Sequence, residues 1–475
     1  MPFPFVLPTT SYLSFPDYFN SGTHPSLPLT ATICRGVVRD ALKKHKRLPP
    51  QSQASNLSNV LAALNEYIPY IFALDAGLTG APINDEEVDV VLVKELEVQW
   101  RATLTATLPS REPPRIKLKS LEAELFFVLS TLAYTCSLLA RSQLRTLFDA
   151  ILPSPEQRAA AIASAMRYLL DANTTHTYLV HRSSQWSSPP AAVDISAPVL
   201  SALASLTMAE ATLIAVLKDD PYPAVVAEDR NENSKDWMFK NPDIPKVRAH
   251  LFARLCLAAA EHAAKAQGML GRASRVDEGL VRHIDDLRRT ARGKACRFFG
   301  IDAELGGETG KGIAWLRAAR KEMGFLAANG DEGKKSRGFS KLKKEWAERR
   351  EDRKIEKGGD WGSDGGKFEE GRIVDMLEKK WVKANDTMNV QLIPSSEPLL
   401  ASMPSGREYH TQKPFTVPML DVDVIARMRA PPDPSDAVFK GSEEDSGSDE
   451  EGSGTAPVGA FPGTRAEYSG SNAYF

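Results

Sequence analysis

The sequence contains a run of 16 residues without a charged side chain, Leu125 to Ala140, that must be kept from water. A helix that spans a membrane needs about 20 mostly apolar residues. The run is shorter than this and includes four hydroxyl-bearing side chains, those of Ser130, Thr131, Thr135 and Ser137. We therefore expect a buried helix that neighbouring elements cover on more than one side.

Other segments have the same apolar, helical spacing, and their repetition predicts the fold class. The expected helices cover Ser58–Leu78 (ended near Gly77), Ser154–Leu170, Ser196–Lys218, Pro245–Leu270, Ser274–Phe299 (ended by Gly300), Gly312–Ala328 and Glu370–Ala384. No exact sequence repeat accompanies them. The sequence predicts an all-α chain, a layered array of helix pairs.

Two local patterns are more specific. Ser154, Pro155 and Gln157 form a capping-box signature, which predicts that a helix starts at Pro155. The segments LEVQW (Leu96–Trp100) and RIKLK (Arg115–Lys119) alternate apolar and polar residues on either side of a turn-rich stretch. They predict a small β-hairpin, which must pack on the helices because a lone hairpin is marginally stable.

Composition limits the class of protein. Hydrophobic residues make up 42% and charged residues 25%, and the formal net charge is -2, so the whole chain has no bias toward nucleic acid or anionic lipid. Four widely spaced cysteines without a CxxC pair indicate a reducing cytosol. The N-terminus lacks the basic start and apolar core of a secretory signal.

Two segments are predicted to lie outside the packed body. Residues 330–366 are glycine-rich and charged, and Lys334–Lys357 holds eleven Lys/Arg against five Asp/Glu, a local excess of 11 - 5 = +6. Residues 432–475 have the composition of a disordered tail, with six acids from Glu443 to Glu451. The helical domain is accordingly expected over residues 1–431, with 330–366 as a flexible insert.

No residue pattern indicates a catalytic, cofactor or metal site. The run LGGETGKG lacks the Walker spacing, since Leu305 and Gly312 occupy the positions that need Gly and Ser/Thr, and it is predicted to be a turn between helices. His176 and His181 lack metal-ligand spacing and are expected at the surface or at a helix end. We expect a protein that is not an enzyme.

Docking surfaces are the remaining hypothesis. An array of helix pairs leaves grooves that accept the apolar side of an amphipathic helix. The helices Leu125–Ala140 and Val199–Leu217 offer the candidate groove residues, although such residues are more often core. The candidates for this partner-helix groove are Leu125, Leu129, Leu213, Val216 and Leu217.

The charged segments suggest further sites. Lys341, Lys343 and Lys344 of the basic insert are candidates for membrane contact, and nucleic acid is the alternative, although interleaved acids favour a solvated segment. In the tail, Ser446 and Ser448 lie beside acids and are candidate phosphorylation sites, the alternative being a tail that only aids solubility.

The order of elements resembles the Bro domain of Alix-like proteins. The similarity rests on Val98 and Trp100 followed by SLEAELFFVLSTLAY, on GGETGKGIAWLRAARKEM, and on VKANDTMNVQLIP with Asn385, Asp386 and Pro394. It covers about residues 1–431. The large coiled domain and proline-rich tail of Alix are missing, and the usual Ile-Tyr-His reads Thr387-Met388-Asn389.

Three stretches are more closely similar to fungal palC-type pH-response regulators: MPFPFVLPTTSYLSFPDYF, LKKHKRLPPQSQASNLSNVLAALNEYIPYIFALDAGL and KVRAHLFARLCLAAAEHA. The resemblance implies a Bro-domain fold and a cytosolic adaptor without a cofactor. It implies binding to the C-terminal amphipathic helix of an ESCRT-III subunit and recruitment, with other pH-signalling proteins, to cortical or endosomal membrane. There the adaptor supports proteolytic activation of a transcription factor at alkaline pH, and no nucleic acid is expected as a partner.

Overall fold

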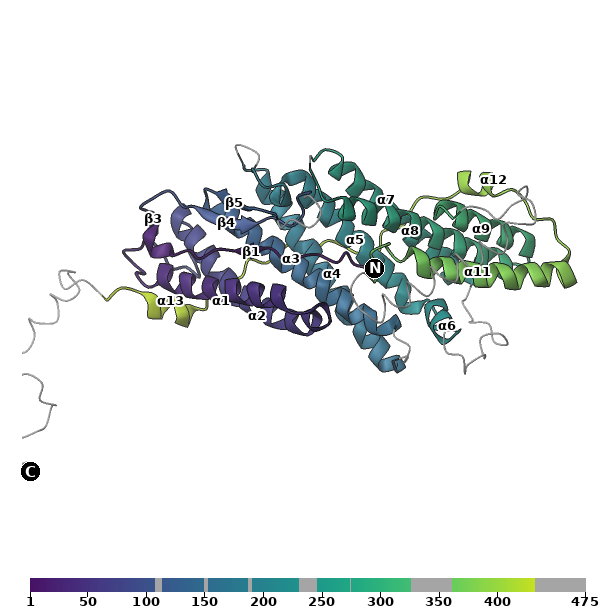
Figure 1. Cartoon of the computed structure of the whole chain (residues 1–475), viewed down its shortest axis with the longest axis horizontal. Coiled ribbons are helices and arrows are strands. Elements are labelled where there is room, and N and C mark those ends of the chain that lie inside the picture. The colour runs from purple at the N-terminus through teal and green to yellow at the C-terminus, as the bar shows by residue number, and fades with distance from the viewer. Residues whose placement is uncertain are drawn as a thin grey trace, which may run out of the picture. The chain divides into compact units, whose positions relative to one another are not determined.

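The structure is a computed structural model, and Figure 1 shows its elements in chain order. Contacts divide the chain into two units, Met1–Arg429 and Ala430–Phe475, and the first holds every helix and strand given below. The structure describes residues 1–106, 113–148, 153–186, 190–229, 246–273, 275–325 and 361–431. Ser446 and Ser448, like Lys341, Lys343 and Lys344, lie outside these residues.

Helices form nearly all of the first unit. The α-helices are α1 (Leu27–Arg47), α2 (Pro50–Thr79), α3 (Leu121–Arg145), α4 (Pro155–Ser183), α5 (Ala197–Asp219), α6 (Tyr222–Asp229), α7 (Lys246–Leu270), α8 (Glu278–Leu305), α9 (Thr309–Glu322), α11 (Lys367–Ala384), α12 (Ser396–Ala401) and α13 (Val422–Met428). Short helices are η1 (Phe15–Asp17), η2 (Thr146–Phe148), η3 (Val193–Ile195) and the π-helix η5 (Asn385–Asn389).

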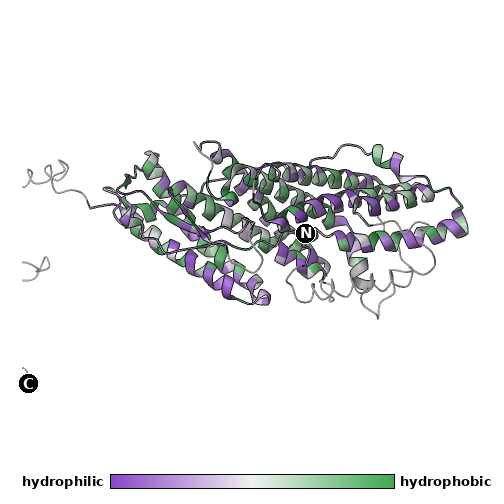
Figure 2. Cartoon of the chain, turned by 45° about the horizontal axis from the view of Figure 1, so that its top comes forward, coloured by the Kyte–Doolittle hydropathy of each residue, from purple (hydrophilic) through white to green (hydrophobic). Residues whose placement is uncertain are grey.

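The long helices pack on one another in chain order. Each of α1, α2, α3, α4 and α5 contacts the next, and the series continues through α7, α8, α9 and α11. Hydrophobic residues run through the packed helices in Figure 2, and hydrophilic residues gather on their outer sides. The predicted all-α array is confirmed.

The uncharged run lies inside α3, and its predicted burial is confirmed. Two stretches of helix, Leu121–Phe148 and Ala197–Asp219, are long and apolar enough to cross a membrane by length and composition. In each, 89% of the most apolar window is buried inside the folded chain. Both are therefore core helices, covered by neighbours instead of lipid.

The predicted hairpin is present, and a third strand joins it. Strand β4 (Val98–Arg101) pairs antiparallel with β5 (Arg115–Leu118), with Val98 opposite Leu118. Strand β1 (Thr9–Thr10) adds to the other edge of β4, and β2 (Phe19–Asn20) pairs with β3 (Val91–Leu92). These strands were missed because two residues are too few to show an alternating pattern.

One predicted helix boundary is confirmed and two are wrong. Ser154 caps α4 through the complete capping box with Gln157. Gly77 and Gly300 do not end helices; α2 continues to a left-handed Gly80, and α8 continues to Leu305. Both glycines instead allow close packing, since a Cβ at Gly77 would lie 2.4 Å from Val90 Cγ2 and one at Gly300 would lie 3.1 Å from the Gly312 carbonyl oxygen.

Glu124 is a buried carboxylate that joins four elements. Arg35 of α1 donates to it through Nε at 2.7 Å and Nη2 at 3.2 Å. Trp100 Nε1 of β4 donates at 2.6 Å, and Tyr67 of α2 donates its hydroxyl at 3.2 Å. Glu124 has no exposed surface, so these donors replace the water that it loses on folding. Arg35 also donates to Thr10 Oγ1 at 2.6 Å, which ties in β1.

His176 is buried, whereas both histidines of the pair were expected at the surface or at a helix end. His181 is exposed in the last turn of α4, but His176 is fully buried and stands 5.9 Å from the Tyr134 ring, centroid to centroid. Neither ring nitrogen has a hydrogen-bond partner among the residues that the structure describes. Burial lowers the pKa of His176 to about 3, so this ring is neutral near pH 7. The spacing of the two histidines in the sequence does not indicate this burial.

We predict that Glu124→Gln lowers the free energy of unfolding by about 3–5 kcal/mol, because the neutral amide leaves the buried Arg35 charge without compensation. Urea unfolding followed by circular dichroism measures the change. The matched control is Glu95→Gln, whose side chain is 67% exposed and forms a surface pair with Lys119; we expect a change within about 0.5 kcal/mol. A loss under about 1 kcal/mol at Glu124 would contradict the prediction.

We also predict that acid weakens the fold through His176. The unfolded chain takes up this proton below about pH 6.5, whereas the folded chain takes it up only near pH 3. The free energy of unfolding therefore falls across this range, by about 2 kcal/mol between pH 6.5 and pH 5 from this group. His176→Leu should reduce the difference in stability between pH 7 and pH 5 by that amount, and exposed His181→Leu should leave it unchanged.

Candidate functional site

The structure divides the five predicted groove residues into two sets. Leu125 and Leu129 of α3 have no exposed surface and lie in the main hydrophobic core. A partner helix cannot reach them without unfolding the domain, so for these two residues the predicted role is corrected to core packing. Leu213, Val216 and Leu217 of α5 are 7%, 1% and 9% exposed, and all three line a pocket.

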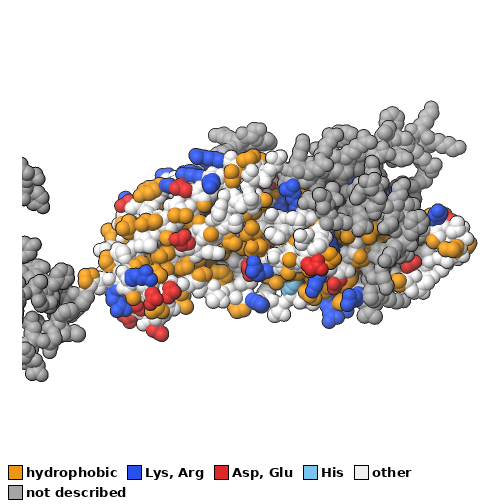
Figure 3. All heavy atoms as spheres, turned by 90° about the horizontal axis from the view of Figure 1, so that it is seen from below, with side chains coloured by type: hydrophobic (Ala, Val, Ile, Leu, Met, Phe, Trp, Pro, Cys, Tyr) orange, Lys and Arg blue, Asp and Glu red, His pale blue; other side chains and the backbone are white. Residues whose placement is uncertain are grey.

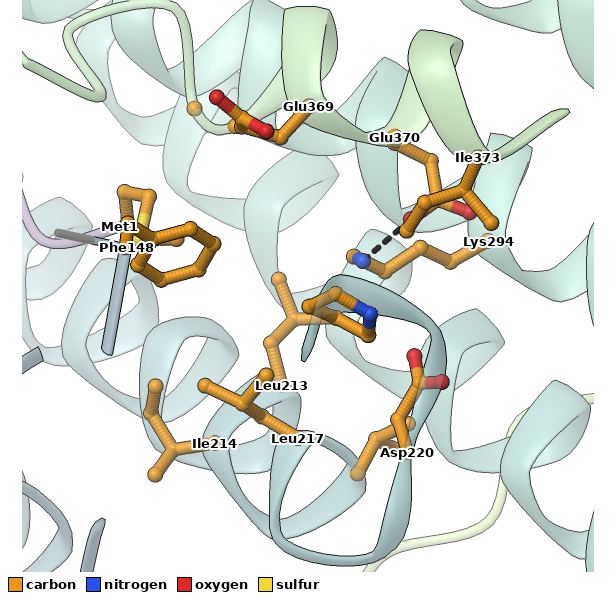
Figure 4. Close-up of a pocket in the computed structure, with 14 residues that line it drawn as sticks. Met1, Phe148, Leu213, Ile214, Leu217, Asp220, Lys294, Glu369, Glu370 and Ile373 are labelled. Carbon is orange, nitrogen blue, oxygen red and sulfur yellow. Dashed lines mark hydrogen bonds and ion pairs between the residues drawn. The ribbon is translucent and has the colours of Figure 1, made fainter. Parts of the chain in front are cut away.

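The pocket lies where α5 ends, beneath the start of α11. Its cavity volume is about 50 Å³, and the space around it opens to solvent. Besides the three predicted residues, its lining includes Met1, Phe148, Ile214, Asp220, Pro223, Lys294, Gly365, Gly366, Glu369, Glu370 and Ile373. Figure 4 shows the side chains of Leu213, Ile214 and Leu217 below the space, with Met1 and Phe148 on one side and Glu370 and Lys294 on the other.

The apolar part of the pocket is held in place by aromatic packing. Phe148 ends η2, directly after α3, and its ring lies 5.2 Å from the ring of Trp361, centroid to centroid. Trp361 is 2% exposed, and the guanidinium of Arg141 lies 5.4 Å from its ring centroid. The pocket therefore has a preformed wall that can bind an apolar side chain.

The polar part of the pocket is a buried ionic network. Arg297 of α8 donates through Nη2 to Asp220 Oδ2 and through Nε to Glu370 Oε1, both at 2.5 Å. Lys294, one turn before Arg297, also donates to Glu370. Asp220 follows α5 and Glu370 belongs to α11, so the network ties the ends of both helices to α8.

The charges of this network stabilise one another. Burial alone would raise the pKa of Glu370, but the positive charges of Arg297 and Lys294 outweigh it and hold that pKa below its usual value. Burial alone would likewise lower the pKa of Arg297, and Asp220 and Glu370 raise it instead. Glu370 therefore stays ionised at physiological pH, and the pocket keeps a charged rim beside its apolar floor.

The segment before α11 is packed against the same region. Residues 361–366 belong to the predicted flexible insert, yet Trp361 is buried and His283 Nδ1 donates to the Ser363 carbonyl oxygen at 3.0 Å. Asp364 accepts hydrogen bonds from the backbone N–H groups of Gly366 and Phe368 and so starts α11. This end of the predicted insert is corrected to packed structure.

The side chains in the described part of the chain do not form a reactive centre. No group of three His, Cys, Asp or Glu residues there could hold a metal ion. All four cysteines are free and buried, and burial raises the pKa of Cys34 to about 11 and those of Cys136 and Cys256 to about 12. These thiols are protonated near pH 7 and are weak nucleophiles.

The glycine run is an interhelical turn, as predicted, and it binds the segment that contains Asn385. The Gly310 N–H donates to Gln391 Oε1 at 3.0 Å, and Gln391 Nε2 donates to the Gly307 carbonyl oxygen at 2.8 Å. Asn385 binds both backbone groups of Gln391 through its side-chain amide. Two stretches that carry the Bro-domain resemblance thus contact each other directly.

Several site residues were missed from the sequence. Asp220 and Glu370 have charged neighbours in the sequence, so their burial could not be expected, and Phe148 follows α3 without any regular spacing. A signal did exist for Arg297, which stands in the apolar stretch from Ala295 to Ile301. A charge inside such a stretch needs a buried partner, but the sequence does not say which acid supplies it.

Solved structures share this fold. The chain matches a crystal structure of ALIX in complex with the SIVmac239 PYKEVTEDL late domain, with a TM-score of 0.54 and 16% identity; the match covers 88% of this chain and half of that one. It also matches the ALIX BRO1 CHMP4C complex, with a TM-score of 0.52 and 15% identity, over 88% of this chain and 96% of that one. The predicted Bro-domain fold is confirmed.

Sequence comparison identifies a relative that is similar along its whole length. No model of a known protein family matches the chain. The pH-response regulator protein palC of Emericella nidulans is 46% identical over 512 aligned residues, which cover all of both proteins. The expectation of a protein that is not an enzyme is confirmed, because this full-length relative is a regulator protein. The chain belongs to the palC family of pH-response regulators.

Proposed function

We propose that the protein is an adaptor of ambient-pH signalling that binds the C-terminal amphipathic helix of an ESCRT-III subunit through the pocket between α5 and α11. In this proposal the bound polymer brings the protein to endosomal or cortical membrane, together with other pH-signalling proteins. The assembly then supports proteolytic activation of the pH-responsive transcription factor at alkaline pH.

The observation that carries the proposal is the composition of the pocket. Leu213 and Leu217 form an apolar floor and Phe148 an apolar wall, while Glu369, Glu370 and Lys294 supply charged groups to the lining. An amphipathic helix places apolar residues on one side and polar residues on the other, so it complements such a surface. A helix that buries a few leucines there would bind with micromolar affinity, about -8 kcal/mol, which suits reversible assembly.

The comparisons add indirect support. The relative is named for the pH response, and one structural neighbour is the ALIX BRO1 domain in complex with CHMP4C. In that complex a protein of the same fold binds a partner protein. Its sequence is only 15% identical to this chain, so the likeness shows the fold and does not by itself assign the same partner to this chain. Binding to ESCRT-III by this chain is therefore our inference from the pocket together with the fold.

A second function remains a hypothesis from the sequence. The basic segment with Lys341, Lys343 and Lys344 lies outside the described residues, and it would bind a membrane surface or nucleic acid by charge alone. Such binding weakens steeply as salt rises. Apolar binding in the pocket changes little with salt, so the two hypotheses make opposite predictions.

We predict that Leu217→Ala weakens binding of a labelled peptide of the ESCRT-III C-terminal helix about ten-fold, because the pocket loses roughly 1–2 kcal/mol of apolar contact. Fluorescence anisotropy with the full chain, at low and high salt, measures the affinity. Leu129→Ala is the matched control, since Leu129 is buried away from the pocket. It should lower stability by about 2–5 kcal/mol and leave the peptide affinity of the folded protein unchanged.

The outcomes separate the hypotheses. Equal weakening by the two leucine variants would contradict the pocket as the binding site. Binding that disappears at high salt and on substitution of Lys341, Lys343 and Lys344 with Gln would favour the basic segment. An absence of peptide binding under all conditions would withdraw the ESCRT-III partner while leaving the fold and family unaffected.

A further inference from the structure

Helix α1 exposes an apolar stripe to solvent. Its buried side packs Leu27, Ala31, Cys34, Val38 and Leu42 into the core. On the opposite side Leu29, Ile33 and Val37 are 53%, 60% and 47% exposed. Their spacing of four residues places them on one face, one turn apart. Single exposed apolar residues are common on protein surfaces, but three in a row on one helix face are not.

An aromatic residue extends this stripe. Tyr12 is 70% exposed and follows β1, which lies along α1 because Arg35 donates to the Ser11 carbonyl oxygen at 2.8 Å. The guanidinium of Arg39 stands 5.7 Å from the Tyr12 ring centroid, so Tyr12 flanks the exposed face of α1. Tyrosine, with an apolar ring and a polar tip, suits the boundary between water and lipid.

The same face of α1 becomes basic toward its end. After Val37 the exposed residues along this face are Asp40, Lys44 and Arg47, and Asp40 is paired with Arg39 at 2.9 Å. Lys43 and Lys46 lie beside them. We call the four apolar residues Tyr12, Leu29, Ile33 and Val37, together with the basic residues Lys43, Lys44, Lys46, Arg47 and Arg115, the α1 ridge.

The cations of the α1 ridge lie close enough to repel one another. Partial burial lowers the pKa of Lys43, and the positive charges of Arg39, Arg115 and Arg47 lower it further, although Asp40 opposes them. Partial burial and the charges of Arg101 and Arg115 lower the pKa of Lys46 in the same way. An anionic ligand would relieve this repulsion.

The electrostatics of a helix end explains only some of these positive charges. Cations in the last turn of a helix stabilise its negative end, which accounts for Lys44, Lys46 and Arg47. It does not account for Arg115, which comes from β5, or for the apolar stripe on the same face. In Figure 3 hydrophobic side chains spread over the part of the chain that carries α1 and α2 in Figure 1, with Lys and Arg side chains along an edge.

We propose that the α1 ridge is a binding surface for an anionic lipid membrane. The apolar residues Tyr12, Leu29, Ile33 and Val37 enter the headgroup region, and the basic residues bind lipid phosphates and carboxylates. An exposed apolar stripe that continues into Lys44 and Arg47 on the same helix face, with further cations beside it, matches this ligand in both respects. The site is independent of the pocket and of the proposed ESCRT-III partner.

The test is sedimentation of the full chain with vesicles of phosphatidylcholine alone or mixed with phosphatidylserine. We expect binding to the mixed vesicles that weakens with salt, and little binding to the neutral ones. Substitution of Lys43, Lys44 and Arg47 with Gln should weaken binding about a hundred-fold. The matched control is Gln at Lys311, Lys379 and Lys383, surface lysines of α9 and α11 that should not contribute.

A second variant tests the apolar contact. Ile33→Asp changes an exposed side chain, so the fold should persist, and we expect vesicle binding to weaken about ten-fold or more. The proposal is overturned if both α1 variants bind like the unchanged protein, or if binding is lost only on replacing Lys341, Lys343 and Lys344. It is also overturned if Ile33→Asp converts a dimer to a monomer without changing vesicle binding, which would make the stripe an interface between copies.

Discussion

The N-terminal half of the fold depends on one buried carboxylate, that of Glu124. A charge without exposed surface is tolerated only when donors replace its water, and here Arg35, Trp100 and Tyr67 do so from three different elements. Because hydrogen bonds are directional, they determine where α1, α2 and β4 lie around α3. Apolar packing alone would define the positions of these elements less precisely. The same bonds hold α1 with its apolar stripe facing solvent.

A second buried network has the same role near the pocket. Arg297 holds Asp220 and Glu370, and with them the end of α5 and the start of α11. This pairing holds the first turn of α11 over Leu213 and Leu217 and so helps to maintain one wall of the pocket. The apolar surface proposed to bind the partner helix thus depends on buried charges. The α1 ridge lies on a different helix of the same domain.

Much of the fold was predictable because it depends on local chemistry. Helical spacing predicts the long helices, and the capping box at Ser154 predicts where α4 begins. Gly77 and Gly300 were misassigned because a glycine that allows close packing looks the same in sequence as one that ends a helix. The groove was predicted only in part, since Leu129 and Leu213 have similar helical surroundings in the sequence while one lies in the core and the other in a pocket.

The sequence by itself determined that the chain forms helices, where several of them begin, and that no catalytic motif is present. Its resemblance to Bro-domain proteins supplied the fold family. Only the tertiary structure decided which apolar residues meet solvent or a pocket, and which buried charges pair. The physical reason is that burial and pairing depend on residues far apart in the chain: Arg35 and Glu124 are 89 residues apart, and Asp220 and Arg297 are 77 apart.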